Sequence, residues 1–452
     1  MNLSIIKITF TFRELIQIAA SGVMIFGIGL MILGGFQILE NKLLLIQNAF
    51  AYSSVGFIIY WLSSYWGKPA GIKNDGVWFK AVSSRKWIAW LLAIVLTSFY
   101  CILYWFPEYL GYNEKGNTGF VAFFDPLSYY LKNKAASQWF VYGVLYTWAI
   151  LLFGIKFIIK YRHSRYQILR TLSVMFFQTA FAFIIPEFLQ RMNLPYHDYK
   201  NIWPLNYYFF DGWHLDEMLM NGKIGYWMLM SGILMILIGS PILTFLFGKR
   251  WYCSWICGCG GLAETAGDAF RQLSDKSVKA WKLERIIIYS ILLFVRAMTG
   301  GVFYTYLTGE LYLLGISTDK IRSIYGFAIG ATFSGVIGVG FYPLLGSRVW
   351  CRFGCPMAAI LGIQQRFFSR FRITTNGGQC ISCGNCSSYC EMGIDVRSYA
   401  QNGKNIVRAS CVGCGICAAV CPRGVLKLEN GTIDLFNRVE NPYLKNPPTT
   451  KS

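Results

Sequence analysis

The sequence predicts an α-helical polytopic membrane protein of about eight spans with a small α+β domain near its C-terminal end. Three observations support this fold class. The 452 residues are 55% hydrophobic and only 14% charged, whereas soluble domains are about 25% charged. The mean hydropathy is +0.42, and apolar runs of about 20 residues recur along the chain. All of the 14 cysteines except Cys101 fall in four short clusters, which is typical of metal sites or disulfides.

Eight apolar runs are each long enough to cross a hydrocarbon core of about 30 Å. The first five belong to a predicted N-terminal membrane region, residues 1–224, with periplasmic loops. The last three belong to a second region, residues 225–372. The predicted spans are 16–38, 43–62, 87–106, 138–158, 168–189, 225–248, 286–308 and 322–346.

Successive connections between these spans alternate between strongly basic and less basic. The lead-in with Lys7 and Arg13 and the connections 63–86, 159–167 and 249–285 are rich in lysine and arginine. The positive-inside rule therefore places both termini and all four cysteine clusters on the cytoplasmic side of the inner membrane. The formal charge of +20 reflects these loops and not nucleic-acid binding. Because that side is reducing, metal thiolates are favoured over disulfides.

The second membrane region contains an internal repeat. The segments "LTFLFGKRWYCSWICG" and "FYPLLGSRVWCRFGCP" share an apolar span, a glycine, an arginine, a tryptophan and a Cys-x-x-x-Cys pair. Gly326 and Gly330 in the last span have the small-xxx-small spacing that allows helix backbones to approach closely. Two such spans side by side would bring both cysteine pairs to one place.

The segment 373–440 contains two runs of Cys-x-x-Cys-x-x-Cys-x-x-x-Cys, the pattern of a two-cluster ferredoxin-like domain. In this pattern the fourth cysteine of each run binds the other cluster. Zinc is disfavoured because four-cysteine zinc sites use two pairs and not triplets. Residues 441–452 are predicted to be a disordered tail. The predicted ligands are Cys380, Cys383, Cys386 and Cys421 for cluster 1, and Cys411, Cys414, Cys417 and Cys390 for cluster 2.

Details of these runs add to the prediction. Gly384, Gly413 and Gly415 leave room for the loops to curl and offer amide donors to sulfides. Glu391 stands where such runs usually have proline, and is expected to shift the potential of the adjacent cluster.

The pairs Cys253/Cys257 and Cys351/Cys355 have two interpretations. They form one four-thiolate site for an iron–sulfur centre or another soft metal, or each pair is a redox-active or copper(I)-binding dithiol. Cys259 is either a substitute ligand or a spare thiol, and Cys101 is a packing residue.

Three further groups are candidates for function. Arg296 falls near the middle of span seven, where it would balance cluster charge, hold a quinone oxygen or form a salt bridge inside the bundle. Glu264 and Asp268 are either its partners, proton carriers or water-facing acids. The aromatic loop 196–218 is either an interfacial belt or a docking surface or quinone pocket with His197, Asp211 and His214 as polar groups. No histidine lies mid-span, so haem within the bilayer is not expected.

The cysteine pattern over residues 225–435 resembles that of the membrane polyferredoxins of the NosR, NapH and CcoG type. In this pattern, Cys-x-x-x-Cys(-Pro) motifs at span ends precede a two-cluster ferredoxin domain. The chain departs from it at Gly258, which replaces proline, and at the extra Cys259. The resemblance implies membrane electron transfer that serves a periplasmic reductase or, in the CcoG branch, copper reduction during oxidase assembly.

The predicted function is transfer of single electrons between a cytoplasmic or quinol donor and a periplasmic reductase of the nitrous oxide or nitrate type, or its maturation system. The alternatives are a copper-reducing assembly factor and a redox-sensing membrane regulator. Whether the chain is itself an enzyme, such as a quinol dehydrogenase subunit, stays open. The predicted cofactors are two 4Fe–4S clusters, with a third iron–sulfur centre or copper at the membrane face, and quinone as a further candidate. The predicted partners are the bilayer, the electron donor, and a periplasmic acceptor or membrane subunits.

Overall fold

A computed structural model describes residues 11–36, 41–71, 86–310, 312–313 and 315–431. Within these ranges, eight helices are long and apolar enough to cross a membrane, which confirms the predicted fold class. The predicted tail 441–452 and Lys7 lie outside the described residues. The eight spans are Phe12–Gly35, Lys42–Tyr65, Trp87–Trp105, Gln138–Lys160, Arg165–Arg191, Gly222–Phe247, Val278–Thr308 and Thr318–Gly340.

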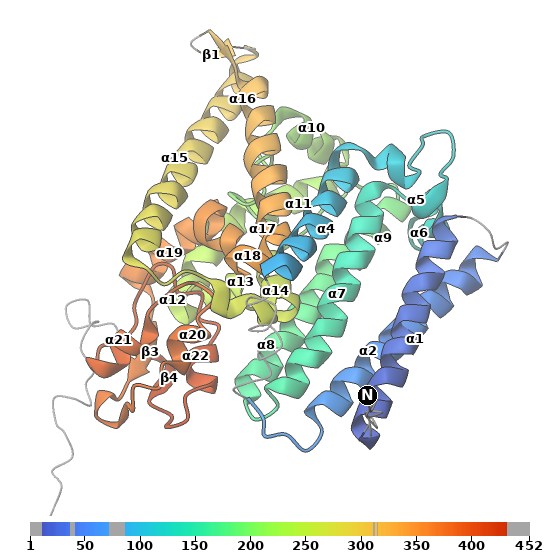
Figure 1. Cartoon of the computed structure of the whole chain (residues 1–452). Helices are drawn as coiled ribbons and strands as arrows, with labels where there is room; N and C mark the ends of the chain where they lie inside the picture. The colour runs from blue at the N-terminus through green and yellow to red at the C-terminus, as the bar shows by residue number, and fades with distance from the viewer. Residues whose placement is uncertain (1–10, 37–40, 72–85, 311, 314, 432–452) are drawn as a thin grey trace, which may run out of the picture.

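The first two spans form a tight antiparallel hairpin at one side of the bundle (Figure 1). A capping box at Thr11 and Glu14 begins α1, and the Asn41 side chain caps α2. The helix α7 packs against α2 of this hairpin, and α4 packs in turn against α7. The bounds are α1 Phe12–Gly35, α2 Lys42–Tyr65, α4 Lys86–Trp105 and α7 Gln138–Lys160.

Three of the later spans change helix type inside the membrane. Each contains a π-helical segment, a feature that is frequent at functional sites. The elements are α8 Arg165–Phe176, η2 Phe177–Ile184 and α9 Ile185–Arg191; α11 Gly222–Leu234, η3 Met235–Gly239 and α12 Ser240–Phe247; α16 Thr318–Tyr325, η5 Gly326–Ile337 and α17 Gly338–Gly340; and the uninterrupted α15 Val278–Thr308.

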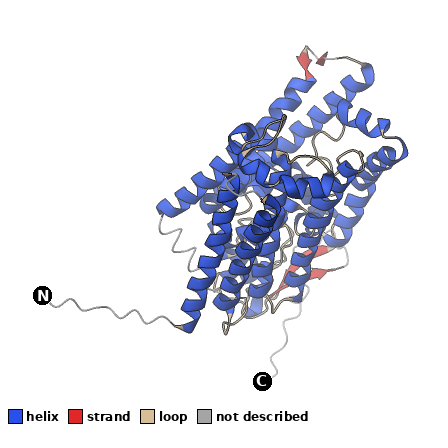
Figure 2. Ribbon diagram, turned by 90° about the vertical axis from the view of Figure 1, so that its right-hand side faces the viewer, coloured by secondary structure: helices blue, strands red, loops and turns tan. Residues whose placement is uncertain are grey.

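Short elements connect the spans at the two ends of the bundle, which consists mainly of helices (Figure 2). At the end opposite the C-terminal domain lie η1 Pro107–Leu110, α5 Gly119–Phe123, α6 Asp125–Lys132, α10 Gly212–Met220, β1 Tyr312–Leu313 and β2 Ile316–Ser317. On the side of the C-terminal domain lie α13 Arg250–Cys253, α14 Gly258–Thr265, η4 Ala266–Leu273, α18 Tyr342–Leu345, η6 Trp350–Gly354 and α19 Pro356–Phe368.

The C-terminal domain is a two-stranded antiparallel sheet with short helices. Phe371 pairs with Asn430 and Thr375 with Leu426, so the strands enclose the two cysteine runs. The N-terminal end of α1 lies at the same end of the molecule as this domain (Figure 1). The elements are β3 Phe371–Thr375, η7 Gly377–Gln379, α20 Asn385–Ser388, α21 Val396–Gln401, α22 Ile416–Ala419 and β4 Leu426–Asn430.

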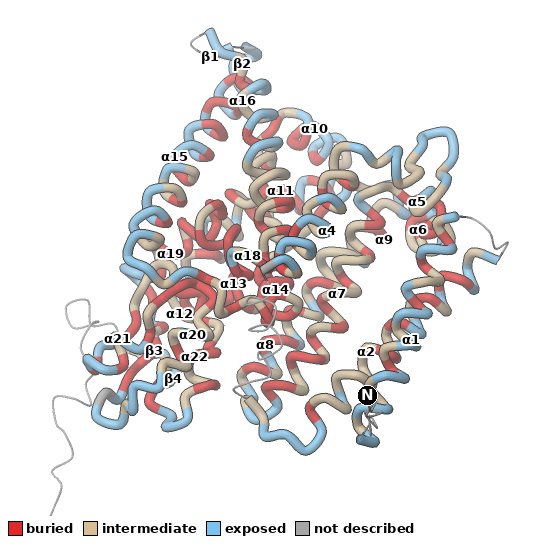
Figure 3. Tube along the Cα trace, viewed as in Figure 1, coloured by how far each residue is buried: buried red, intermediate tan, exposed pale blue. Residues whose placement is uncertain are grey.

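The main hydrophobic core crosses the boundary between the spans and the C-terminal domain. Buried residues gather around α13, α14 and α18, whereas the outer faces of α1 and α15 are exposed, as lipid-facing helices are (Figure 3). One cluster joins Trp251 and Trp350 of the repeated motifs to Ile373 and Leu426 of the sheet. The C-terminal domain is therefore docked on the membrane region.

The two glycines of the last span do not serve the role expected from their spacing. A Cβ on Gly326 would lie 2.5 Å from the Tyr207 hydroxyl, and one on Gly330 would lie 3.1 Å from the Tyr207 ring. The close approach is therefore made by a tyrosine of the 190–224 loop and not by a second helix backbone. The spacing alone cannot distinguish these two occupants.

The α1–α2 hairpin allows a test of the fold. A Cβ on Gly56 would lie 2.6 Å from two backbone atoms of α1, the Ala20 oxygen and the Met24 nitrogen. We expect Gly56→Val to lower the stability by about 1–3 kcal/mol, because backbone atoms cannot give way as a side chain can. The melting temperature in detergent measures this loss. Gly22→Val is the matched control because nothing lies within 4 Å of that position, and equal melting of the two variants would contradict the packing.

Candidate iron–sulfur sites

The two cysteine runs of the C-terminal domain cross over, as the spacing predicts. One cavity is lined by Cys380, Cys383, Cys386 and Cys421. A second cavity is lined by Cys390, Cys411, Cys414 and Cys417. In each set, three thiols come from one loop and the fourth from the other run, so each cavity presents four soft ligands to one point.

The loops that carry these thiols need glycine. Gly384, Gly413 and Gly415 have φ angles of +79°, +66° and +72°, a region that other residues rarely adopt. Burial raises the pKa of Cys390 to about 11 and that of Cys414 to about 12. A bound metal removes the proton from such a thiol outright. The residues therefore fit an iron–sulfur cluster, which would supply one-electron redox chemistry when bound.

The repeated Cys-x-x-x-Cys pairs meet in one place. Cys253 lies on α13 and Cys351 in η6, while Cys257 and Cys355 are the N-cap residues of α14 and α19. All four are only 6–8% exposed and share one hydrophobic core. The two helix N-termini therefore begin at two of the thiols, and their dipoles favour negative charge there.

Electrostatics and spacing describe this four-thiol site further. Burial, followed by the charges of Cys351, Cys253 and Cys257, raises the pKa of Cys355 well above its usual range. A single tetrahedral zinc with Zn–S bonds of about 2.3 Å would place its sulfurs about 3.8 Å apart. Among the described residues, no three cysteine sulfurs lie within 4.8 Å of one another. This spacing disfavours a single metal ion held by three or four of these thiols.

Cys259, the third thiol of the first motif, lies beside this site. A hydrogen bond between the two side chains lowers the pKa of Cys257 to about 6 and raises that of Cys259. Cys101 lies on α4, outside the hydrophobic core that the four motif cysteines share.

A buried network of charges joins the four-thiol site to the second tail site. Glu391, which has no exposed surface, forms ion pairs with Arg271 at 2.8 Å and with Arg348 at 2.9 Å. Arg348 also pairs with Glu264 at 2.6 Å and reaches the sulfur of Cys351 at 3.5 Å. Arg348 therefore contacts a thiol of one site and the residue that follows Cys390 of the other.

Further members complete this network. Asp268 pairs with Arg271 at 2.7 Å and with Lys160 at 2.6 Å, and Arg170 pairs with Glu264. Glu264 and Asp268 are each 2% exposed, so the expectation that they face water is wrong. Arg271 and Lys160 hold the pKa of Asp268 well below its usual range despite its burial.

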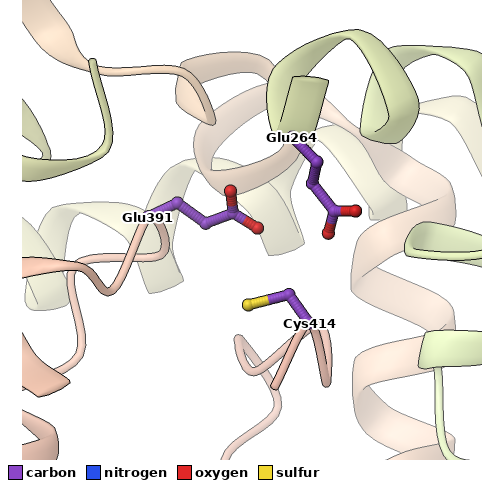
Figure 4. Close-up of side chains that lie close together, drawn as sticks. All are labelled: Glu264, Glu391 and Cys414. Atoms are coloured by element: carbon purple, nitrogen blue, oxygen red, sulfur yellow. The ribbon is translucent and has the colours of Figure 1, made fainter. Parts of the chain in front are cut away.

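Glu264, Glu391 and Cys414 converge from three segments of the chain (Figure 4). Their ligand atoms all lie within 4.8 Å of one another. The arginines already neutralise both carboxylates, so this group marks the contact between the membrane region and the second tail site.

Side chains of the membrane region also bind the loop of the second site through its backbone. Four consecutive carbonyl groups, from residue 411 to residue 414, each accept a hydrogen bond. The donors are Gln365 at 2.8 Å, Ser254 at 2.9 Å, Tyr166 at 2.9 Å and Gln167 at 2.9 Å. Because these donors come from three separate segments, the loop is held on several sides.

The structure does not bring Arg296 to any of these sites. Its side chain is exposed on α15, between the exposed Leu293 and Phe294 and the open space over Gly300. No ion pair is recorded for it among the described residues. Neither a role against cluster charge nor a salt bridge inside the bundle fits this position, because the helix turns it away from the core.

The three polar groups predicted in the 196–218 loop are buried, and two of them, Asp211 and His214, have polar partners. His197, Asp211 and His214 are at most 7% exposed. Asp211 pairs with Arg322 at 2.8 Å, and the ring of His214 contacts the Phe209 carbonyl at 3.0 Å. Burial raises the pKa of Asp211 to about 6 and lowers that of His197 to about 4. Part of the loop folds inward, because the Tyr252 hydroxyl donates to its Lys200 carbonyl at 2.8 Å. Its Tyr196, Tyr199 and Trp213 side chains are exposed, as an interfacial belt requires.

Comparison with known proteins supports the iron–sulfur interpretation. A family model described as a 4Fe-4S dicluster domain matches residues 379–426. A model described as a 4Fe-4S binding domain matches twice, at residues 229–277 and 327–374, which confirms the internal repeat.

The similar curated proteins include three of this type. The putative electron transport protein YccM of Escherichia coli is 26% identical over 42% of this chain and 56% of its own length. The ferredoxin-type protein NapH of E. coli is 26% identical over 34% and 53%. The methylamine utilization ferredoxin-type protein MauN of Paracoccus denitrificans is 29% identical over 34% and 52%. The chain thus spans about half the length of the curated relatives it matches. The expected likeness to membrane polyferredoxins is confirmed, and no solved structure matches.

The buried charge network predicts a strong effect of one substitution. We expect Arg271→Met to cost about 3–5 kcal/mol, because it leaves Glu391 and Asp268 buried with one cation fewer. The melting temperature and the rate of proteolysis of the C-terminal domain measure the loss. Arg285→Met, at an exposed arginine in the first turns of α15, is the control and should change stability by less than about 0.5 kcal/mol. Equal behaviour of the two variants would show that the network does not hold the domain.

Proposed function

We propose that this protein is a membrane-bound iron–sulfur electron-transfer protein of the inner membrane, with its clusters on the cytoplasmic side. Three sets of four cysteines would each hold a cluster: the two sets of the C-terminal domain and the set Cys253, Cys257, Cys351 and Cys355. The observation that carries the proposal is the connection of the four-thiol set to the second tail set, since Arg348 contacts both Cys351 and Glu391, the residue after Cys390. A metal storage or purely structural role does not require such a connection.

The order of the sites follows from their surroundings. Cys383 is exposed, whereas Cys411 and Cys417 are buried, so the first tail site faces solvent and the second faces the membrane region. A soluble donor would therefore meet the first site, and the four-thiol site would be the last of the series, beneath the bilayer. The donor is a cytoplasmic carrier, or quinol if electrons run in the opposite direction.

The buried charges between the four-thiol site and the second tail site would stabilise the negative charge of bound clusters. Arg348, Arg271, Arg170 and Lys160 place four cations against three carboxylates, Glu264, Asp268 and Glu391. The excess positive charge would favour the negative charge that thiolate-bound clusters carry. Because these groups are buried and paired, little reorganisation is needed when an electron arrives.

The acceptor is proposed by likeness. NapH and MauN are ferredoxin-type proteins by name, so a partner reductase or its maturation system on the periplasmic side, of the nitrate or nitrous oxide type, suits this chain. Copper(I) bound by the cysteine pairs, and with it copper reduction, is an outcome of the test below.

Metal counts test the third centre. We expect Cys253→Ala and Cys351→Ala each to remove about four irons per chain, because one missing thiolate leaves a cubane without a corner. The tail signals in paramagnetic resonance should persist. Cys101→Ala is the control and should lose no iron. Loss of copper and retention of iron would instead indicate a metal-handling protein.

Labelling tests the sidedness. Lys115, between η1 and α5, and Lys427, on β4, are exposed, and α5 and β4 lie at opposite ends of the molecule (Figure 1). In intact spheroplasts, a membrane-impermeant maleimide should label Lys115→Cys at once, and Lys427→Cys only after lysis, because the positive-inside rule places the C-terminal domain within the cell. Labelling of Lys427→Cys before lysis would overturn the proposed orientation.

A further inference from the structure

A large cavity leads from the face opposite the C-terminal domain to the four-thiol site. Its volume is about 1160 Å³, which exceeds the usual range of ligand pockets. Its lining begins at the exposed Lys134, Asn193 and Glu217 and ends at Cys257 and Cys259. The cavity therefore connects the opposite side of the bundle with the proposed third centre.

The deep end of this cavity is a polar site. Gln178 is 5% exposed, and its amide nitrogen donates to the Thr147 hydroxyl at 3.2 Å. Its Oε1 atom is buried and has no partner. The Lys200 ammonium lies near this Oε1 atom, beside Gly258. It pairs with the Asp198 carboxylate at 3.6 Å. One acceptor and one donor thus meet beside the thiols, and an orphaned buried acceptor is costly unless a ligand satisfies it.

Gly258 makes this arrangement possible. A Cβ at this position would lie 2.7 Å from Gln178 Oε1 and 3.0 Å from Lys200 Nζ. Glycine in place of the usual proline therefore allows both polar groups to reach the cysteine loop. This departure from the pattern of the second motif has a specific consequence at this site.

The walls of the cavity are aromatic. They include Tyr142, Tyr146, Tyr207, Tyr252 and Trp350. Rings of this kind stack on flat conjugated molecules. The ligand that suits the whole site is planar, with a carbonyl for Lys200 and an N–H for Gln178 Oε1.

We propose that this cavity binds a water-soluble, planar heteroaromatic redox carrier of the flavin class, next to Cys257. The polar residues at the mouth indicate a carrier that arrives from water and not from the lipid. Lys134 at the mouth offers a cation to an anionic tail such as a phosphate. Carbonyl and N–H groups on one ring edge match the donor and acceptor at the deep end.

The inference rests on the proposed function for its purpose, since the third centre would exchange electrons with the bound ring. Reduction of a flavin-class ring takes two electrons, delivered one at a time by the centre, and two protons. The protons would come from water in the mouth of the cavity. No bond to the protein forms or breaks.

The test uses the whole holoprotein in lipid nanodiscs, prepared without oxygen, with flavin mononucleotide as the probe. Binding is followed by quenching of the flavin fluorescence. We expect saturable binding, and an increase of the Kd of at least tenfold in Lys200→Met and in Gly258→Ala. Lys223→Met, an exposed lysine outside the cavity, should leave the Kd unchanged. Unaltered tail signals in paramagnetic resonance show that the variants are folded.

Each outcome decides a separate point. Absence of flavin binding to a protein that retains its third centre overturns this inference alone. Binding that is unaffected by Lys200→Met and Gly258→Ala places the flavin elsewhere and also overturns it. Binding of decylubiquinone without binding of flavin mononucleotide would show that the cavity takes a lipid-borne carrier, and would overturn the proposal of a water-soluble one. Flavin binding with the predicted losses in a protein without a third centre supports the site and overturns the proposed function.

Discussion

The burial of Glu391 between two arginines is the constraint on which the arrangement of this protein depends. A carboxylate without exposed surface must be paired, because an isolated buried charge costs several kcal/mol. Its partners, Arg271 and Arg348, come from the connection before α15 and from the second cysteine motif. The ion pairs therefore help to fix where the C-terminal domain lies on the membrane region, and with it the place of the second tail site beside the four-thiol site.

The internal repeat is used asymmetrically. Each motif has an arginine three residues before its first cysteine, and each ends with a cysteine at the start of a helix. Arg348 enters the charge network, whereas Arg250 lies 4.2 Å above the ring of Phe371 at the start of β3. The C-terminal domain docks on one side of a nearly symmetric pair, so equivalent residues acquire different contacts.

Sequence reasoning could predict the spans, the repeat and the cysteine sets, because hydrophobic length and ligand spacing are local properties. The charge network cannot be predicted in this way, because its members are far apart in the chain. The one local signal for it is Glu391, which stands in place of proline after Cys390. The sequence does not show which side of α15 is exposed, so it cannot tell that Arg296 points away from the core. In the inward-folded 190–224 loop, Tyr207 packs at Gly326 and Gly330, and Lys200 lies at Gly258. No periodicity in the sequence reveals these contacts.

The exposure of Cys383 has a practical consequence. The first tail site meets solvent, whereas the cysteines Cys411 and Cys417 of the second site are buried. Dioxygen reaches a cluster from the solvent, so a cluster at the first tail site would be damaged in air before one at the second. Protein purified in air would then show fewer clusters than it has in the cell, because the exposed one is lost while the deeper ones remain intact.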